Sequence, residues 1–540
     1  MMKKINYILA FFILACLVFQ GCKKTSTDFK DPYADGRPSL GVLLTPTTPP
    51  SPAIGAPGTE VTFQAKGFMK YKDKMVFYFN GEEAEVKNVT ETTIVAIVPA
   101  NGSGGVVSIG IDDQLVIGPV FAVTGNIKFD PSFRATAGTD NSVNSVYSLP
   151  DGRNLVLGNF TNYDNKGFIL PVNRIARVSE NGEYDATFRS GKGASGVLSR
   201  AVQIGNRIYI AGGFGGYDQR GSDISNITAL FTNGSIDTIQ IKTKKKPTLT
   251  DTVTRKWFPK FNGGTNEYIN RVYNHQGKIL ATGDFRFYVK RTYDKDNYNF
   301  TRDTVILDST EIRQILKFNL DGSLDKTYRF NVATGKGNAG ANGHIDSYMH
   351  TEGPLLEKLL IFGNFTTFDG QPAGKILRLK VDGTLDPTFT PGSGANEYIA
   401  SLTYNIATKK YFITGGFNSY NGTPVPGMAL LNEDGTIDKS FIAQRFDTGF
   451  ATYAQQLSNG LIVVTGSFRK YGGVSRNGFM VLTAKGDLAK GYNATGPFNG
   501  YVSDIKETKS ADGKMALLLM GRFNRFDLKD VNNIIRVTVE

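Results

Sequence analysis

A short apolar segment ending in glycine and phenylalanine recurs along the chain and constrains its fold more than any other feature. The first copy is Gly158-Asn159-Phe160, and an aromatic residue follows it at Tyr163. Six further copies contain Phe214, Phe285, Phe365, Phe417, Phe468 and Phe523, at intervals of 51 to 80 residues. Self-similarity at such a spacing predicts a propeller or another array of like units.

Each repeat contains four short runs that are compatible with strands. In the first copy they lie at 143–149, 154–160, 174–178 and 184–188, with an Asp-Gly turn at 151–152 and an Asn-Gly turn at 181–182. These dipeptides favour hairpins because they accept positive φ. The second run is almost wholly apolar, as in a strand buried on both faces. The chain is therefore predicted to be all-β, with a seven-bladed β-propeller over residues 126–540.

A second signature marks the fourth run of several repeats. It occurs as Gly322-Ser323-Leu324-Asp325 and as Gly383-Thr384-Leu385-Asp386, and related residues at 129–133 precede any first strand. Since the chain ends in a third strand at 534–539, we expect residues 127–133 to pair with the last blade and close the ring, which removes open sheet edges. The aspartates are expected to cap local backbone N–H groups. With both signatures, residues 126–540 resemble the delta-sixty repeat β-propeller family of secreted bacterial proteins, which implies no reaction.

The N-terminus has the features of an export signal. Residues 1–21 combine a basic start with an apolar run of about 15 residues, shorter than the roughly 20 that span a membrane. The end of this run, Phe19-Gln20-Gly21-Cys22, resembles a bacterial lipobox, although leucine usually stands where Phe19 is. The resemblance implies lipidation of Cys22 and a membrane anchor. We expect the protein to be anchored in the outer membrane and exposed on the surface, although the residues after Cys22 do not decide which leaflet it faces. Residues 22–39 are predicted to be a flexible tether.

Residues 40–125 are predicted to form a small β-sandwich. Six runs with strand character, at 60–65, 75–80, 84–89, 93–98, 106–111 and 115–123, are separated by turn residues. Pro57-Gly58-Thr59, Gly67-Phe68 and the Asn80-Gly81 turn resemble the immunoglobulin-like IPT/TIG module. In secreted bacterial proteins that module implies a spacer or a domain that binds carbohydrate or a protein partner. We expect this domain on the short-turn side of the propeller, where the first strand enters.

Two long insertions supply the candidate binding residues. They occupy 239–262 and 289–313, in links at the end opposite the short turns, so they should meet on a long-loop face. Aromatic rings can stack on a sugar, and basic groups attract anionic polymer. The alternative is a pair of solvated loops. Asp294, Asp296 and Asp303 are spaced loosely like a calcium loop but lack its glycine and terminal glutamate. The candidate ligand-binding residues are Trp257, Lys256, Arg255, Tyr293 and Tyr298.

No motif in the sequence indicates catalysis, a metal or a cofactor. The chain has three histidines, none in a recognisable motif, and two cysteines without metal-site spacing. The net charge of +12 is modest for 540 residues, and no nucleic-acid-binding signature accompanies it. We therefore expect a non-catalytic envelope lipoprotein that binds a glycan or protein ligand. The alternatives are a scaffold or adhesion partner of an outer-membrane complex and, less favoured, a polysaccharide hydrolase or lyase.

Overall fold

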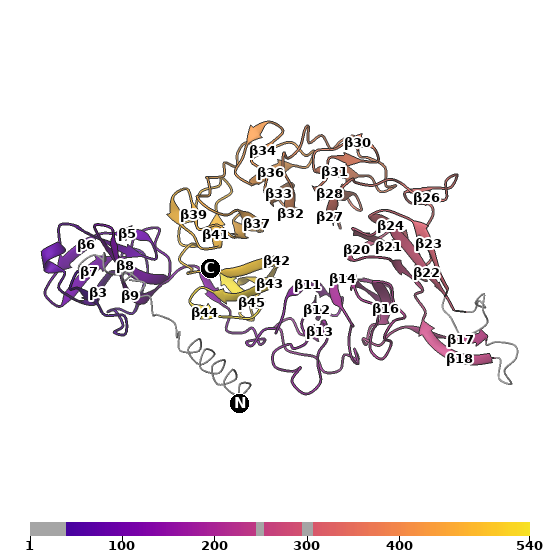
Figure 1. Cartoon of the computed structure of the whole chain (residues 1–540), viewed down its shortest axis with the longest axis horizontal. Helices are drawn as coiled ribbons and strands as arrows, with labels where there is room; N and C mark the ends of the chain where they lie inside the picture. The colour runs from indigo at the N-terminus through magenta and orange to yellow at the C-terminus, as the bar shows by residue number, and fades with distance from the viewer. Residues whose placement is uncertain (1–38, 245–252, 294–305) are drawn as a thin grey trace, which may run out of the picture.

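Short strands provide nearly all the regular structure of this protein. The computed structural model describes residues 39–244, 253–293 and 306–540, and the only helical element among them is a 3-10 turn at Met69–Tyr71. Figure 1 shows a ring of sheets with a small separate domain beside it. The leader, with Cys22, lies outside the described residues.

The small domain consists of two sheets around one core. One sheet has the order β1-β3-β7-β6, and the other has the order β2-β9-β8-β4-β5. The rings of Phe63, Phe77, Phe79 and Phe121 pack between them with centroids 5.0 to 6.4 Å apart. The strands are β1 (Leu43–Leu44), β2 (Ile54–Gly55), β3 (Glu60–Lys66), β4 (Met75–Phe79), β5 (Glu82–Ala84), β6 (Val86–Val89), β7 (Thr93–Ile97), β8 (Gly105–Ile111) and β9 (Gln114–Val123).

The ring is built from antiparallel sheets that follow one another in chain order. In each, the first strand lies nearest the centre in Figure 1, and the second strand is central in the sheet. Six sheets have three strands: β11 (Val143–Ser148), β12 (Asn154–Gly158) and β13 (Ile175–Val178); β14 (Val197–Ile204), β15 (Arg207–Gly213) and β16 (Ile227–Phe231); β20 (Ile269–His275), β21 (Lys278–Gly283) and β24 (Ile315–Phe318); β27 (His344–Met349), β28 (Leu359–Asn364) and β31 (Ile376–Leu379); β32 (Ile399–Asn405), β33 (Lys410–Gly415) and β36 (Met428–Asn432); β37 (Ala451–Gln456), β38 (Ile462–Gly466) and β41 (Phe479–Leu482).

The last sheet joins the two ends of the ring sequence. It has the order β10-β45-β43-β42, where β10 is Ile127–Phe129, β42 is Asn499–Lys509, β43 is Met515–Phe526 and β45 is Ile534–Val539. Ile127 pairs with Val539 in antiparallel register. Phe160 of the first repeat shares a core with Leu518 and Met520 of this sheet. The first and last sheets are therefore neighbours, as Figure 1 also shows.

The apolar core lies between neighbouring sheets, and the repeated phenylalanines fill it. Phe160, Phe214, Phe285, Phe365, Phe417, Phe468 and Phe523 are 0% to 3% exposed, which confirms that these rings are core residues. Burial of this size is the main stabilising contribution to such a fold.

The expected fourth strands are mostly reduced to single bridges followed by an aspartate turn. Val178 bridges Tyr184, and Phe318 bridges Leu324. The aspartate that follows accepts the backbone N–H two residues later, as at Asp386, where the Thr388 N–H lies 3.0 Å away. Its other oxygen accepts from the buried Arg378 guanidinium at 2.8 Å. The carboxylate therefore caps a turn, as expected, and also forms an ion pair that the sequence did not reveal.

The small domain contacts the rim of the ring at links of the long-loop end, between strands two and three and before the first strand of the next sheet. The backbone N–H of Ser475, between the second and third strands of its sheet, donates to Glu82 at 2.5 Å. Gly104 N–H donates to the carbonyl of Ala494, in the link before β42, at 2.8 Å. The expectation of a short-turn location is therefore wrong. A single outer strand, β10, carries the chain into the ring, and the domain packs beside the ring against these links.

Candidate functional site

The repeated Gly-x-Phe segment places its middle residue on the surface, where the second strand ends beside the start of the innermost strand. We call this side of the ring's centre the channel mouth. Its glycine is required because strand one approaches closely: a Cβ on Gly158 would lie 2.1 Å from the Ser142 carbonyl oxygen. Two copies are Gly-Gly-Phe, with Gly212 and Gly415 in this position. The middle residues between buried neighbours are Asn159, Gly213, Asp284, Asn364, Gly416, Ser467 and Arg522.

Aromatic side chains stand beside these positions at the start of the inner strands. Because strands one and two are antiparallel, the beginning of an inner strand lies next to the end of the Gly-x-Phe strand, as Ile399 pairs with Gly415. The residue just before that pairing is aromatic in five consecutive sheets. We call these residues the mouth arc: Tyr268, His344, Tyr398, Phe450 and Tyr501.

The mouth arc is accessible and locally supported. Tyr268, Phe450 and Tyr501 are 37%, 38% and 47% exposed. The Tyr398 ring covers Gly416, where a Cβ would lie 2.5 Å from it, and the Tyr268 ring covers Gly213 at 2.7 Å. Glycine in the middle position thus leaves room for a flat ring. These rings offer partly exposed apolar faces at the start of the innermost strands, an arrangement suited to planar stacking.

One arc residue forms an ion pair at the channel edge. His344 Nδ1 lies 2.6 Å from the Asp284 carboxylate, and both side chains are about half exposed. The hydrogen bond to Asp284 raises the pKa of His344 above its ordinary value, and burial opposes it with a smaller effect. His344 therefore gains positive charge more readily than a free histidine.

On the innermost strands, four charged side chains from different sheets neutralise one another. Arg271 makes two hydrogen bonds to Asp346, of 2.9 and 2.7 Å. Arg200 lies 3.6 Å from Asp504, and the Tyr453 hydroxyl donates to Asp504 at 3.2 Å. Two cations face two anions, so the cluster has no net charge.

This cluster is better suited to holding the inner strands together than to proton transfer. Burial raises the pKa of Asp346, but the charge and hydrogen bonds of Arg271 outweigh burial and lower it below the ordinary value. A general acid at neutral pH needs a raised carboxyl pKa. Asp346 remains a carboxylate, and its guanidinium partner occupies both of its oxygens.

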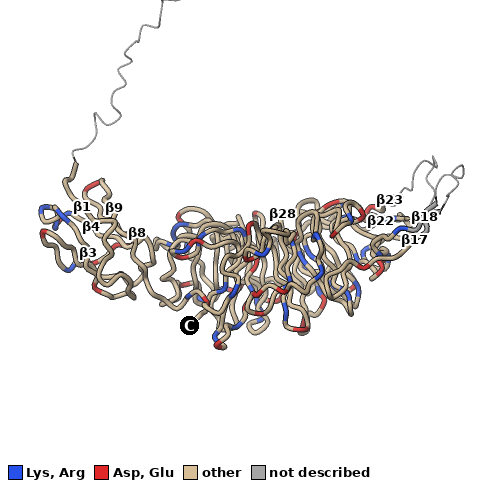
Figure 2. Tube along the Cα trace, turned by 90° about the horizontal axis from the view of Figure 1, so that it is seen from below, with Lys and Arg blue, Asp and Glu red and all other residues tan. Residues whose placement is uncertain are grey.

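The predicted binding residues lie elsewhere and are only partly brought together. The insertions form two hairpins, β17 (Thr238–Lys244) with β18 (Val253–Pro259) and β22 (Phe287–Thr292) with β23 (Ile306–Glu311). They meet as expected, because the rings of Phe258 and Tyr293 stack 4.1 Å apart. Figures 1 and 2 show them projecting from the outer edge of the ring, opposite the small domain, rather than beside the channel.

The five predicted ligand-binding residues differ in whether the structure leaves them accessible. Trp257 is 52% exposed, and Lys256 is also exposed, but neighbours in a strand face opposite sides. Arg255 pairs in register with Lys242. The prediction that Tyr293 binds a ligand is wrong. The residue is 5% exposed and stacked on Phe258, so its ring is not available for stacking on a ligand. Tyr298 and the three aspartates considered for calcium lie outside the described residues.

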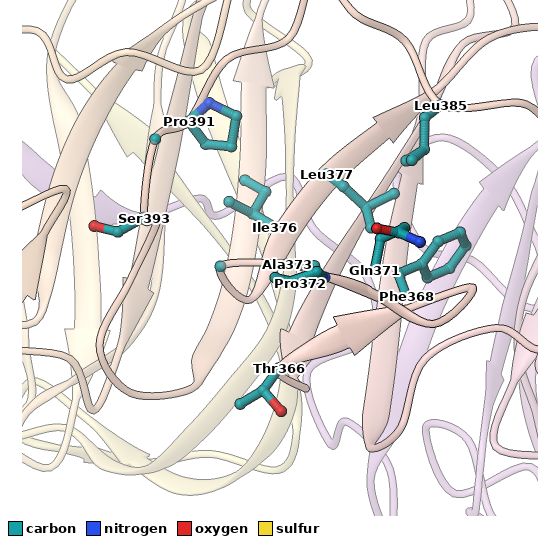
Figure 3. A pocket seen from close by; sticks show the side chains of 12 residues that line it. Thr366, Phe368, Gln371, Pro372, Ala373, Ile376, Leu377, Leu385, Pro391 and Ser393 are labelled. Carbon is teal, nitrogen blue, oxygen red and sulfur yellow. The ribbon is translucent and has the colours of Figure 1, made fainter.

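A cavity on the outer part of the ring lacks groups that would fix a ligand. It has a volume of about 450 Å³, and Figure 3 shows its lining from β29 (Thr367–Phe368), β30 (Gln371–Pro372), β31 and the link at 391–393. Its labelled side chains are apolar except Thr366, Gln371 and Ser393. We therefore do not place the site there.

Lysine, arginine and acidic residues are mixed around the ring in Figure 2, without a face of one sign. Across residues 39–244, 253–293 and 306–540, no group of three or more His, Cys, Asp or Glu side chains is placed to hold a metal ion. None of the described helices is long and apolar enough to cross a membrane.

Comparisons with known proteins identify the fold class. A family model described as a domain of unknown function (DUF5122) β-propeller matches residues 358–389 and 407–441. A second, described as a domain of unknown function (DUF5008), matches residues 19–119. The chain is a β-propeller protein. No curated protein matches it.

Solved structures that match the chain do so with low identity and low TM-scores. The WD40 β-propeller domain of Doa1 is 13% identical, with a TM-score of 0.37, over 76% of this chain and 96% of that one. A structural genomics protein of unknown function from Bacteroides thetaiotaomicron is 12% identical, with a TM-score of 0.28, over 92% and 99%. An auxiliary nutrient binding protein from Bacteroides ovatus is 14% identical, with a TM-score of 0.19, over 69% and 94%. These values carry no conclusion about function.

The sequence contains a signal for the mouth arc that the repeat phenylalanines obscured. Asn266-Glu267-Tyr268-Ile269 recurs as Asn396-Glu397-Tyr398-Ile399. In both, the asparagine oxygen accepts two backbone N–H groups just after the Gly-x-Phe segment, at 2.7 and 3.0 Å for Asn266. The asparagine thus fixes the start of the inner strand. A repeated segment in which an aromatic residue follows a capping asparagine thus predicts the position of an exposed ring at the start of an inner strand.

Proposed function

We propose that this chain is a non-catalytic cell-envelope lipoprotein whose seven-bladed propeller binds a glycan at the channel mouth. The observation that carries the proposal is the mouth arc, five aromatic residues at equivalent positions of consecutive sheets. Tyr268 and Tyr501 expose more than a third of their surface beside polar side chains. Exposed rings with nearby polar groups suit a sugar, which presents an apolar face and hydroxyl edges.

The envelope location rests on the leader. The basic start, the apolar run and Cys22 support export and lipid anchoring, and an IPT/TIG-like sandwich at 40–125 would separate the anchor from the ring. Stable anchoring takes more than one acyl chain, as lipidation of an N-terminal cysteine provides. Metabolic labelling with a fatty acid should mark the wild-type chain and leave Cys22→Ser unmarked.

The binding proposal can be tested by affinity electrophoresis in gels that contain single polysaccharides. Tyr398→Ala removes one ring of the arc, while Trp257→Ala removes the exposed ring of the hairpin. An aromatic contact contributes about 1 kcal/mol, so Tyr398→Ala should weaken retention about fivefold. Trp257→Ala is the matched control, and retention lost only in that variant would place the site on the hairpin instead.

A protein ligand, as for a scaffold or adhesion partner, is the second candidate. Phe168, Ile169 and Leu170 form a loop tip with exposures of 77%, 99% and 67%, and Leu115 and Ile117 are more than half exposed on the small domain. Contiguous exposed apolar residues mark interaction surfaces. Ile169→Asp should abolish co-purification with an envelope partner if the scaffold function holds, without changing retention by a polysaccharide.

A further inference from the structure

A cavity at the junction of the first and last sheets continues the mouth arc. It has a volume of about 420 Å³ and lies between the start of β42, the end of β43 and the links that precede β11 and β45. Tyr501, at the end of the arc, forms part of its wall. Its other polar lining residues are Asp140, Asn499, Arg522, Asn524, Asn532 and Asn533.

Most of these polar groups already have partners within the protein. Asp140 accepts the backbone N–H groups of Thr161 and Asn162 at 2.8 and 2.9 Å. Asn499 donates to Asn524 at 2.8 Å. The Asp140 carboxylate is thus used as a cap, like Asn266 in the third sheet. The cavity wall is held rigidly by these contacts.

Arg522 is the exception. It is exposed in the middle position of the Gly-x-Phe segment, directly opposite Tyr501 in the strand register. Among the described residues it forms no ion pair or side-chain hydrogen bond. The other middle positions are glycine, serine, asparagine or aspartate, so this sheet alone presents a cation there. Guanidinium has a planar fork that matches carboxylate and sulfate oxygens in pairs.

We propose that this cavity binds an acidic sugar residue, with Arg522 paired to its carboxylate or sulfate group and Tyr501 stacked on its ring. The inference rests on the proposed function and adds the ligand class. A glycan lying along the arc would present its charged unit at the junction of the first and last sheets. Amide groups of Asn524 and Asn532 lie beside the same cavity for the sugar hydroxyls.

The test uses the full chain and two pairs of polymers that share a backbone. Polygalacturonate is compared with its methyl ester, and dextran sulfate with dextran, by affinity electrophoresis at fixed salt. Wild type should be retained more by the charged member of at least one pair, and the pair shows whether carboxylate or sulfate is preferred. Arg522→Gln should weaken that retention roughly tenfold, the loss expected for one charge-assisted pair, and so remove most of the difference between the charged and the neutral member.

Lys485→Gln is the control, because it removes one exposed positive charge on a short turn of the sixth sheet. An equal loss in Lys485→Gln and Arg522→Gln would overturn the inference in favour of bulk electrostatics. Equal retention by charged and neutral members, weakened by Tyr398→Ala, would overturn it while leaving the proposed function intact. Failure of wild type to bind either acidic polymer would also overturn it.

Discussion

Asp130 follows the first strand of the ring and pairs with Arg536 in the last strand. Removal of its buried carboxylate should destabilise the whole ring. Asp130 and Arg536 are each 1% exposed as side chains, and the Arg536 Nε lies 2.5 Å from an Asp130 oxygen. The other Asp130 oxygen accepts from the Ser132 backbone and hydroxyl at 2.8 and 2.6 Å. In Asp130→Asn the guanidinium would stay buried without its counter-charge.

Breaking a buried pair in this way costs about 3 to 5 kcal/mol. Arg536 keeps acceptors at the Glu180 carbonyl, at 2.9 Å, and at Asn181, at 2.8 Å, so we expect the lower end, about 3 kcal/mol. The assay is urea unfolding of the full chain followed by circular dichroism. Asp487→Asn is the control, since that aspartate is exposed, and it should change stability by less than about 0.5 kcal/mol.

The pH dependence of the stability of Asp130→Asn is a second test of the same ion pair. Burial raises the pKa of Asp130, but its bonds to Ser132 and Arg536 lower the value overall. A carboxylate whose pKa is depressed by folding stabilises the protein above the unfolded value, and this contribution is lost as pH falls toward the folded value. The difference between wild type and Asp130→Asn should therefore shrink below about pH 4. Equal stability of Asp130→Asn and Asp487→Asn at pH 7 would refute the reasoning.

Three further predictions follow from single contacts. Tyr293→Phe should leave stability unchanged or raise it by up to about 1 kcal/mol in a thermal melt, because the buried hydroxyl has no partner among the described residues; a loss above 1 kcal/mol would show that a partner exists. In an NMR titration, His344 should have a pKa above 6.5 and return toward it in Asp284→Asn; no difference would contradict the 2.6 Å pair. Gly416→Ala should displace the Tyr398 ring and weaken polysaccharide retention with little change in stability, whereas unchanged retention would exclude Tyr398 from the site.

Local patterns made much of the architecture predictable. The Asp-Gly and Asn-Gly turns, the apolar second strands and the displaced copy at 129–133 are all visible over a few residues. In the structure Ile127 pairs with Val539, although the regular strand ends at Phe129 and not at 133. Asp130 bends the chain there by capping Ser132, so the ladder stops.

Contacts between distant residues were not predictable from the same patterns. Asp130 and Arg536 are 406 positions apart, and no sequence pattern around either residue identifies the other as its partner. Tyr293 is an aromatic residue in a long insertion, which predicts an exposed ring, yet its ring is buried against Phe258 of the other insertion. Conversely, Tyr268 and Tyr398 belong to repeated four-residue segments, and recognition of that repeat would have placed part of the arc at the channel mouth.

The most direct measurement of the binding proposal is a crystal structure of the protein with an oligosaccharide from a polymer that it retains. The account predicts sugar rings against Tyr268, Tyr398 or Tyr501 at the channel mouth, with any acidic unit beside Arg522. Sugar bound only against Trp257 on the outer hairpin, with the mouth filled by solvent, would contradict it.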